Sequence, residues 1–181
     1  MRVVGRVGSV PLRGVAVGVA IAGAALCSTG CEKATAAAAT ADMAQVAVPA
    51  SHVEGNNYKV DSKLGDCAAG AECSGTIRLE ALGAYHINDT YPYKFTVIGP
   101  DGGTGVDGLE FLGKDPTRRH VFGKDNGDFD KQAEKVAVLR VRFKAQKPGK
   151  VAFAGRFKLS VCSEANCQLE QADVSFEGPV K

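Results

Sequence analysis

Residues 136–162 read VAVLRVRFKAQKPGKVAFAGRFKLSVC and contain two segments in which apolar and polar side chains alternate. In the first segment the apolar set is Leu139, Val141 and Phe143, and the charged set is Arg140, Arg142 and Lys144. In the second segment Phe157, Leu159 and Val161 alternate with Arg156, Lys158 and Ser160. A period of two is typical of a strand that buries one face. We therefore expect two long strands that the turn Lys147-Pro148-Gly149 joins as an antiparallel hairpin.

Shorter segments with the same alternation lie at residues 75–81, 93–97 and 172–176, and glycine-rich turns separate them. No amphipathic helix is evident that could cover their apolar faces, so one sheet must cover another. About seven short strands in a domain of this length are typical of an immunoglobulin-like fold. We expect residues 53–181 to form an all-β, two-layer antiparallel β-sandwich, with a small closed barrel as the alternative.

The N-terminus has the pattern of a secretion signal. Arg2 and Arg6 precede an apolar run at residues 14–26, GVAVGVAIAGAAL, and small residues follow it. A basic start followed by a short apolar core is typical of a signal peptide. The run is too short to span a bilayer, which requires about 20 apolar residues. We expect residues 1–30 to be a signal peptide and the protein to be exported.

A cysteine follows this signal in a context that resembles a bacterial lipobox. Small residues lead to Cys31 in the stretch LCSTGC, although Ser28 stands where an aliphatic residue is usual. Ordinary cleavage after a small residue further along is the alternative. We expect lipidation at Cys31, a low-complexity tether over residues 31–52, and a lipid-anchored protein in the periplasm or at the outer membrane.

The charge balance gives no reason to expect a nucleic-acid partner. The formal charge of the chain is +2, and residues 1–30 hold three of the arginines and no acidic residue. Subtracting them from the totals of 22 basic and 20 acidic residues leaves 19 basic and 20 acidic side chains. A near-neutral domain lacks the excess of positive charge that phosphate binding requires.

Four cysteines remain after the signal region: Cys67, Cys73, Cys162 and Cys167. An even number in an exported protein indicates disulfides. The spacing favours two local pairs, Cys67–Cys73 and Cys162–Cys167. A local loop of this size stabilises a fold by about 2 kcal/mol, whereas a loop near 100 residues contributes about 4.7 kcal/mol, so pairing across the fold would stabilise it more. Gaps of this length suit a structural zinc site poorly.

Other sequence features suggest no catalytic or metal site. The acidic stretch at residues 125–130 lacks the register of a helix-loop-helix calcium loop, so a solvated turn is expected. His52, His86 and His120 have no partner residues in a recognisable motif. We expect no cofactor, no metal and no enzymatic reaction other than thiol chemistry.

The segment VAFAGRFKLSVCSEANCQLEQADVSF at residues 151–176 resembles part of a known family. Its order of strand, cysteine, short loop, cysteine and strand is similar to the N-terminal immunoglobulin-like domain of the thiol:disulfide interchange protein DsbD, the disulfide bond corrector family. LEALGAYHINDTYPYKF at residues 79–95 extends the resemblance, which covers about residues 57–178. The resemblance implies that Cys162 and Cys167 form a redox pair that passes electrons to thiol proteins outside the cytoplasm.

Two functions follow from these features. The first is a binding or structural module of the cell envelope, anchored to the membrane by the lipid on Cys31 and engaging an envelope protein. The second is an accessory in thiol:disulfide exchange that uses Cys162 and Cys167. A redox thiol requires exposure and a lowered pKa, and Glu164 within the loop opposes that lowering.

Overall fold

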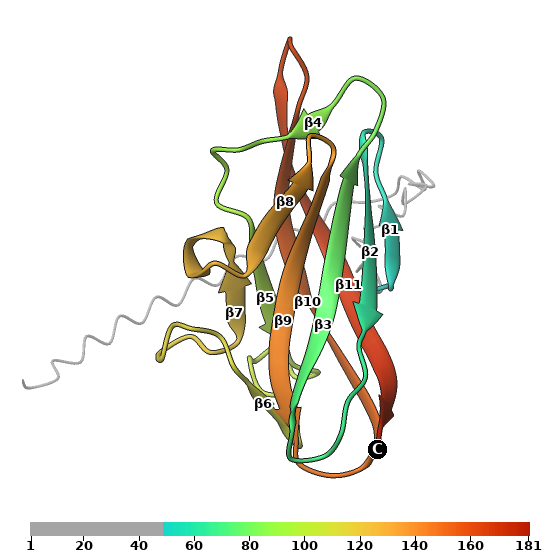
Figure 1. The fold of residues 1–181 in the computed structure, drawn as a ribbon, viewed down its shortest axis with the longest axis vertical. Helices are drawn as coiled ribbons and strands as arrows, with labels where there is room; N and C mark the ends of the chain where they lie inside the picture. The colour runs from blue at the N-terminus through green and yellow to red at the C-terminus, as the bar shows by residue number, and fades with distance from the viewer. Residues whose placement is uncertain (1–48) are drawn as a thin grey trace, which may run out of the picture. The chain divides into compact units, whose positions relative to one another are not determined.

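The computed structural model of the chain describes residues 49–181, which form eleven strands and one short 3-10 turn (Figure 1). The expected signal peptide and the lipidation at Cys31 lie outside the described residues. Within these residues, no helix is long and apolar enough to cross a membrane. The all-β, two-layer prediction is confirmed.

The strands form two antiparallel sheets. The first sheet has the order β1 (His52–Glu54), β2 (Tyr58–Leu64), β3 (Glu72–Ala81), β9 (Val136–Ala145) and β6 (Leu109–Phe111), and β8 (Phe129–Ala133) also pairs with β9. The second sheet has the order β11 (Cys167–Val180), β10 (Gly149–Cys162), β5 (Lys94–Ile98) and β7 (Val121–Gly123), and β4 (His86–Ile87) also pairs with β10. The 3-10 turn η1 spans Lys124–Asn126.

The order of the strands is that of an immunoglobulin-like sandwich. Strands β2, β3 and β9 occupy the places of A, B and E in one sheet, and β6 and β8 share the edge that D would occupy. Strands β11, β10 and β5 occupy the places of G, F and C in the other sheet, with β7 as C′. Because both sheets and their chain order agree with this scheme, the fold is immunoglobulin-like.

The expected hairpin between the two long strands is wrong. Strands β9 and β10 lie in different sheets, so Lys147-Pro148-Gly149 carries the chain from one layer to the other. The partner of β10 is β11, with pairs running from Gly149–Val180 to Cys162–Cys167. A period of two shows which face of a strand is buried, but it contains no information about the neighbouring strand. Both strands therefore bury the predicted face while pairing elsewhere.

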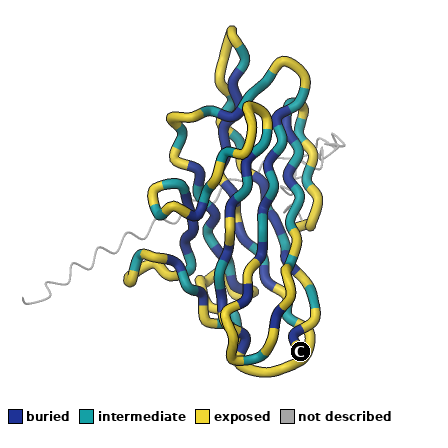
Figure 2. Tube along the Cα trace, viewed as in Figure 1, coloured by how far each residue is buried: buried dark blue, intermediate teal, exposed yellow. Residues whose placement is uncertain are grey.

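Buried residues alternate with more exposed ones along the strands (Figure 2). The buried residues form a core that is rich in aromatic side chains. The inward residues of β9 and β10 that the alternation predicted are fully buried. Phe153 stacks on Phe176 with ring centroids 4.7 Å apart, and Phe143 meets Phe153 edge-on at 5.2 Å. Each such side chain contributes roughly 1.5–3 kcal/mol through burial, so contacts between these rings join the two layers.

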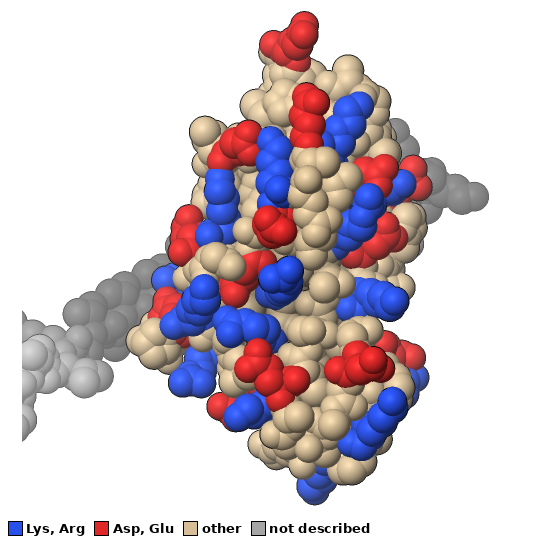
Figure 3. Space-filling model, viewed as in Figure 1, with Lys and Arg blue, Asp and Glu red and all other residues tan. Residues whose placement is uncertain are grey.

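The outward face of the first sheet is charged without being dominated by one sign. Figure 3 shows lysine and arginine interspersed with aspartate and glutamate over the face in which β3 and β9 lie in front. Lys59 pairs with Glu80 at 3.2 Å on this sheet. Intermixed charges of this kind give the face in view no basic stripe.

Candidate functional site

The β10–β11 hairpin ends in a disulfide between Cys162 and Cys167, whose Cα atoms are 4.0 Å apart. The two residues face each other as the last pair of the ladder. Cys162 is only 6% exposed, whereas Cys167 is exposed. We refer to residues 162–169 as the hairpin tip. At this tip the Cys167 half of the disulfide is much more exposed to solvent than the Cys162 half.

Strand β4 covers the buried half of that disulfide. His86 lies directly opposite Cys162 in the register of β4 and β10. Directly paired residues project from the same face of a sheet, so His86, Cys162 and Cys167 form one row across three strands. The sequence indicated no partner residue for His86. The fold places it beside the cysteine pair at a distance of 76 residues from Cys162 in the chain.

Ser160 was expected on the exposed face, and it is instead fully buried. Its side chain projects outward, like that of Lys158 two residues earlier, but the chain that follows β4 covers it. Asn88 Nδ2 donates a hydrogen bond to Ser160 Oγ at 3.2 Å, and the Tyr93 hydroxyl donates one to the Ser160 carbonyl at 2.5 Å. Burial raises the pKa of Tyr93 far above its ordinary value, so this donor keeps its proton.

An apolar side chain stands next to the accessible sulfur. Leu169 follows Cys167 by two positions, so both project from the same face of β11. Its side chain is 69% exposed, and it is the one exposed large apolar residue among residues 49–181. The hairpin tip therefore presents an accessible sulfur and a leucine side by side.

Gln168 anchors the hairpin tip to the rest of the fold. Asn57 Nδ2 donates a hydrogen bond to Gln168 Oε1 at 2.8 Å, and Gln168 Nε2 donates one to the Tyr85 hydroxyl at 3.2 Å. The same hydroxyl donates to Asn166 Oδ1 at 3.3 Å. These bonds hold the hairpin tip against the residue that precedes β2 and against the turn between β3 and β4.

The second disulfide joins Cys67 to Cys73 at the opposite end of the sandwich, where the chain ends (Figure 1). Both cysteines are buried, with exposed fractions of 5% and 1%. The backbone N–H of Lys181 donates to the Cys67 carbonyl at 2.9 Å, so this loop also holds the C-terminus. Both disulfides are local, and the environment of Cys67–Cys73 is that of a structural bridge.

The acidic stretch at residues 125–130 is not a solvated turn throughout. Asp128 is 6% exposed, and its carboxylate accepts hydrogen bonds from the Gly123 N–H at 3.2 Å and from Arg142 at 3.3 Å. Both of its oxygens are used in fixing η1 to β9. Among the described residues, no group of three or more His, Cys, Asp or Glu side chains could hold a metal ion.

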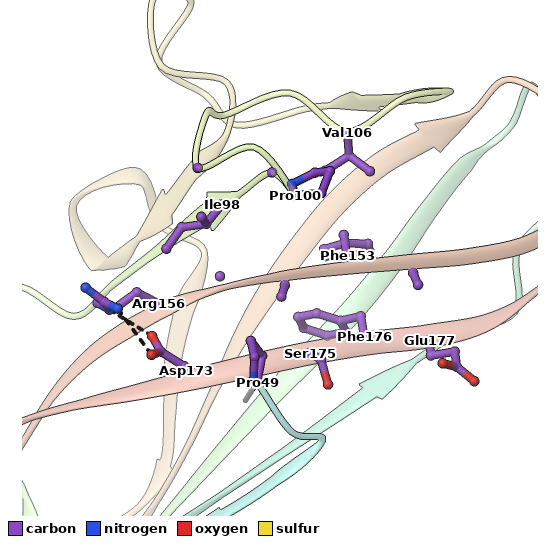
Figure 4. A pocket seen from close by; sticks show the side chains of 15 residues that line it. Pro49, Ile98, Pro100, Val106, Phe153, Arg156, Asp173, Ser175, Phe176 and Glu177 are labelled. Carbon is purple, nitrogen blue, oxygen red and sulfur yellow. Dashed lines mark hydrogen bonds and ion pairs between the residues drawn. The ribbon is translucent and has the colours of Figure 1, made fainter. Parts of the chain in front are cut away.

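A groove of about 640 Å³ lies on the outward face of the second sheet (Figure 4). Its floor is formed by small side chains of β10 and by their neighbours on β5 and β11. Its walls are the loop between β5 and β6 on one side and the start of the described chain on the other. The residues that define it are Ile98, Pro100, Val106, Ala154, Ser175 and Pro49. This lining is mainly apolar, as in most small-molecule sites.

The charged residues at the two ends of the groove are paired with each other. Arg156 binds Asp173 through two hydrogen bonds of 2.8 and 3.2 Å, as the dashed lines in Figure 4 mark. At the other end Glu177 pairs with Lys150 at 2.5 Å. The groove therefore presents aliphatic surface between two neutralised ends.

Sequence reasoning missed this groove because its parts are far apart in the chain. Ala152 and Ala154 come from one strand, Ile98 from another, and Pro49 from the start of the domain. The sequence did contain one sign of the groove. The outward positions of the segment at residues 152–158 change from alanine to Arg156 and Lys158, so the charged face stops where the floor begins.

No protein-family model and no curated protein matches the chain. Solved structures similar to it include AggA, the major subunit of aggregative adherence fimbriae type I from Escherichia coli, with 10% identity over 72% of this chain and 99% of that chain and a TM-score of 0.35. PapD-like domain 7 of human CEP192 has 12% identity over 70% of this chain and 89% of that chain, with a TM-score of 0.27.

A family 123 glycoside hydrolase from Clostridium perfringens has 14% identity over 65% of this chain and 27% of that chain, with a TM-score of 0.29. Similarities at these scores carry no argument about function, and the fold class rests on the order of the strands. None of these three structures is a thiol:disulfide interchange protein. The resemblance to the DsbD domain is therefore supported only as far as the immunoglobulin-like sandwich.

Proposed function

We propose that the chain is an exported, lipid-anchored β-sandwich that binds another molecule of the cell envelope through the groove on its second sheet. The observation that carries this proposal is the groove itself. Its volume of about 640 Å³ lies within the roughly 300–1,000 Å³ of typical ligand pockets, and its lining is mainly apolar. Two disulfides support an oxidising compartment.

The position of the groove suits a tethered protein. Pro49 forms part of its wall, and eighteen residues separate Pro49 from Cys31. A chain of that length spans at most roughly 60 Å when fully extended. A lipid on Cys31 would thus keep the groove within that distance of a membrane surface.

Site-specific photocrosslinking in cells tests this proposal. A photoreactive residue at Pro100, on the rim of the groove, is expected to form an adduct of defined mass. The same residue at Thr76, on the outward face of β3, is the control and should form none. Adding Ala154→Trp fills the floor of the groove and should abolish the adduct at Pro100. Absence of an adduct at Pro100, or its persistence with Ala154→Trp, would contradict the proposal.

One observation favours a second function, which is thiol:disulfide exchange at the hairpin tip. Cys167 is exposed while Cys162 is buried beside β4, so we expect an incoming thiolate to attack Cys167. Attack by a partner dithiol on the Cys167 sulfur would form a mixed disulfide and release Cys162 as a thiolate. The second thiol of the partner would then release Cys167 and leave the partner oxidised.

The buried bridge in the same molecule provides the control for this second function. In a titration with a dithiol reductant, Cys162 and Cys167 should become alkylated well before Cys67 and Cys73. Mass spectrometry of the folded protein identifies the labelled cysteines. Equal resistance of both disulfides would rule out exchange at the hairpin tip.

A further inference from the structure

We infer that the groove is a lipid site, which holds a hydrocarbon chain over Ala154 and an anionic head group at Lys94 and Lys158. This inference rests on the proposed function and names the ligand class of the same groove. The ligand is a single acyl chain with a negative head, as in a fatty acid or one chain of an anionic phospholipid.

The floor of the groove lies low between its walls because its side chains are short. Ala154 pairs with Ile98 on one side and with Ser175 on the other, and these three residues form one outward row. Ala152 continues the floor along β10. Pro100, Val106 and Pro49 rise beside it (Figure 4). An apolar trough of this kind fits a chain of methylene groups, each of which gains about 0.8 kcal/mol on burial.

The backbone of the floor argues against a peptide as the ligand. Strand β10 is central in its sheet, and residues 154–158 pair with β5 on one side and with β11 on the other. Over residues 154–158 the main-chain N–H and C=O groups are thus used within the sheet, and strand addition requires a free edge. A hydrocarbon chain needs no hydrogen-bond partner, so this floor costs it nothing in unsatisfied polar groups.

The charges within the groove also favour an uncharged chain. Arg156 and Asp173 neutralise each other in a two-bond ion pair, and Glu177 is paired with Lys150. A charged ligand group placed between these ends would lose its hydration without gaining a free partner.

Two lysines lie just beyond the Arg156 end. Lys94 and Lys158 face each other directly on β5 and β10 and project from the same outward face. Like charges in directly opposed positions destabilise a sheet. The lysine ion pairs in the described part of the chain involve Lys59, Lys131 and Lys150, so no carboxylate there relieves this repulsion.

An anionic head group would bind both lysines while its chain occupied the floor. Lys158 follows Ala154 by four residues, which is roughly 13 Å along a strand. A long acyl chain spans that distance and fills the groove beyond it. An apolar trough beside two cations that have no ion pair within the described residues should bind an anionic amphiphile more tightly than an uncharged one.

A binding titration with a fluorescent fatty acid, cis-parinaric acid, tests this inference. The protein is the exported chain carrying Cys31→Ser, so that no lipid of its own competes. We expect saturable binding that oleate displaces. Ala154→Trp should weaken the affinity about tenfold or more, and Pro100→Asp, at an exposed wall position, should do the same. Unchanged thermal unfolding verifies that both variants are folded.

The head-group site has its own matched controls. Lys94→Gln with Lys158→Gln should weaken oleate binding several-fold and leave binding of the corresponding fatty alcohol unchanged. Lys144→Gln, on the outward face of the first sheet, should alter neither. Displacement by phosphatidylglycerol vesicles as well as by oleate assigns a phospholipid chain, and displacement by oleate alone assigns a free fatty acid.

Failure of this inference is distinguishable from failure of the proposed function. Equal oleate affinity in the wild type and both groove variants, or no oleate binding at all, would overturn the lipid site. So would an equal effect of the lysine changes on acid and alcohol. A protein adduct at Pro100 alongside such a result would leave the binding module standing with a different ligand.

Discussion

At the scale of single residues, glycines mark where two strands approach too closely for a side chain. A Cβ built on Gly155 would lie 2.4 Å from the Thr96 carbonyl oxygen and 2.5 Å from the Phe95 ring. Both groups belong to β5, which pairs with β10 at this point. Gly155 thus allows β10, which forms the floor of the groove, to approach β5 closely.

Gly155→Ala should therefore destabilise the protein by roughly 1–3 kcal/mol, because the backbone of β5 must shift. Gly105→Ala is the matched control, since a Cβ there meets nothing within 4 Å. Urea unfolding of the two variants gives the difference in the free energy of unfolding. Equal stability of the two variants would show that β5 adapts freely at this position.

A second residue-scale prediction concerns His52. Its Nδ1 lies 2.6 Å from Asp61 Oδ1, and this hydrogen bond, with a lesser effect of Glu54, raises the pKa of His52 above its ordinary value near 6.5. The small stabilisation from a raised pKa is present below the unfolded-state pKa and is lost as the pH rises through the folded-state pKa.

NMR titration should show that Asp61→Asn lowers the pKa of His52 towards 6.5 and that Glu54→Gln lowers it less. A pKa of His52 that does not respond to Asp61→Asn would mean that the hydrogen bond is absent in solution.

At the scale of elements, the alternating pattern predicted which face of a strand is buried, but it did not predict which strands pair with each other. Leu139, Val141 and Phe143 are all fully buried, as the alternation in β9 indicated. The pairing of β10 with β11 instead of β9 follows from contacts between layers that no local pattern contains. The groove escaped prediction for the same reason, because four separate segments build it. The spacing of Cys162 and Cys167, in contrast, was local enough to indicate their pairing.

The two disulfides are expected to contribute differently to stability. Each closes a loop of similar length, for which loop entropy predicts about 2 kcal/mol. Cys67–Cys73 is also buried and holds the C-terminal residue, whereas Cys162–Cys167 closes a ladder that spans the whole of β10. Replacing Cys67 and Cys73 by alanine should thus cost more stability than replacing Cys162 and Cys167. Urea unfolding that ranks the two variants in the reverse order would contradict this assignment.

At the scale of the whole molecule, the sandwich has distinct ends and faces. One end has the buried bridge and the C-terminus, and the other has the hairpin tip with its accessible sulfur. The outward face of β10 carries the groove, which begins beside Pro49 where the tether would enter the domain. Anchoring by Cys31 would keep this face within roughly 60 Å of the lipids from which we infer that it takes its ligand.

Membrane anchoring gives a prediction with an internal control. Cys31→Ser should release the protein from the membrane fraction of cells, and Cys27→Ser should leave it there. Immunoblots of the separated fractions give the measurement. Retention of the Cys31→Ser protein with the membranes would show that another feature anchors the chain.

An NMR titration of the isotopically labelled protein with oleate shows whether the groove binds this ligand. We expect the largest chemical-shift changes at Ile98, Ala154 and Ser175, with a second set at Lys94 and Lys158. Changes confined to the hairpin tip at Cys167 and Leu169, or no saturable changes at all, would contradict binding in the groove.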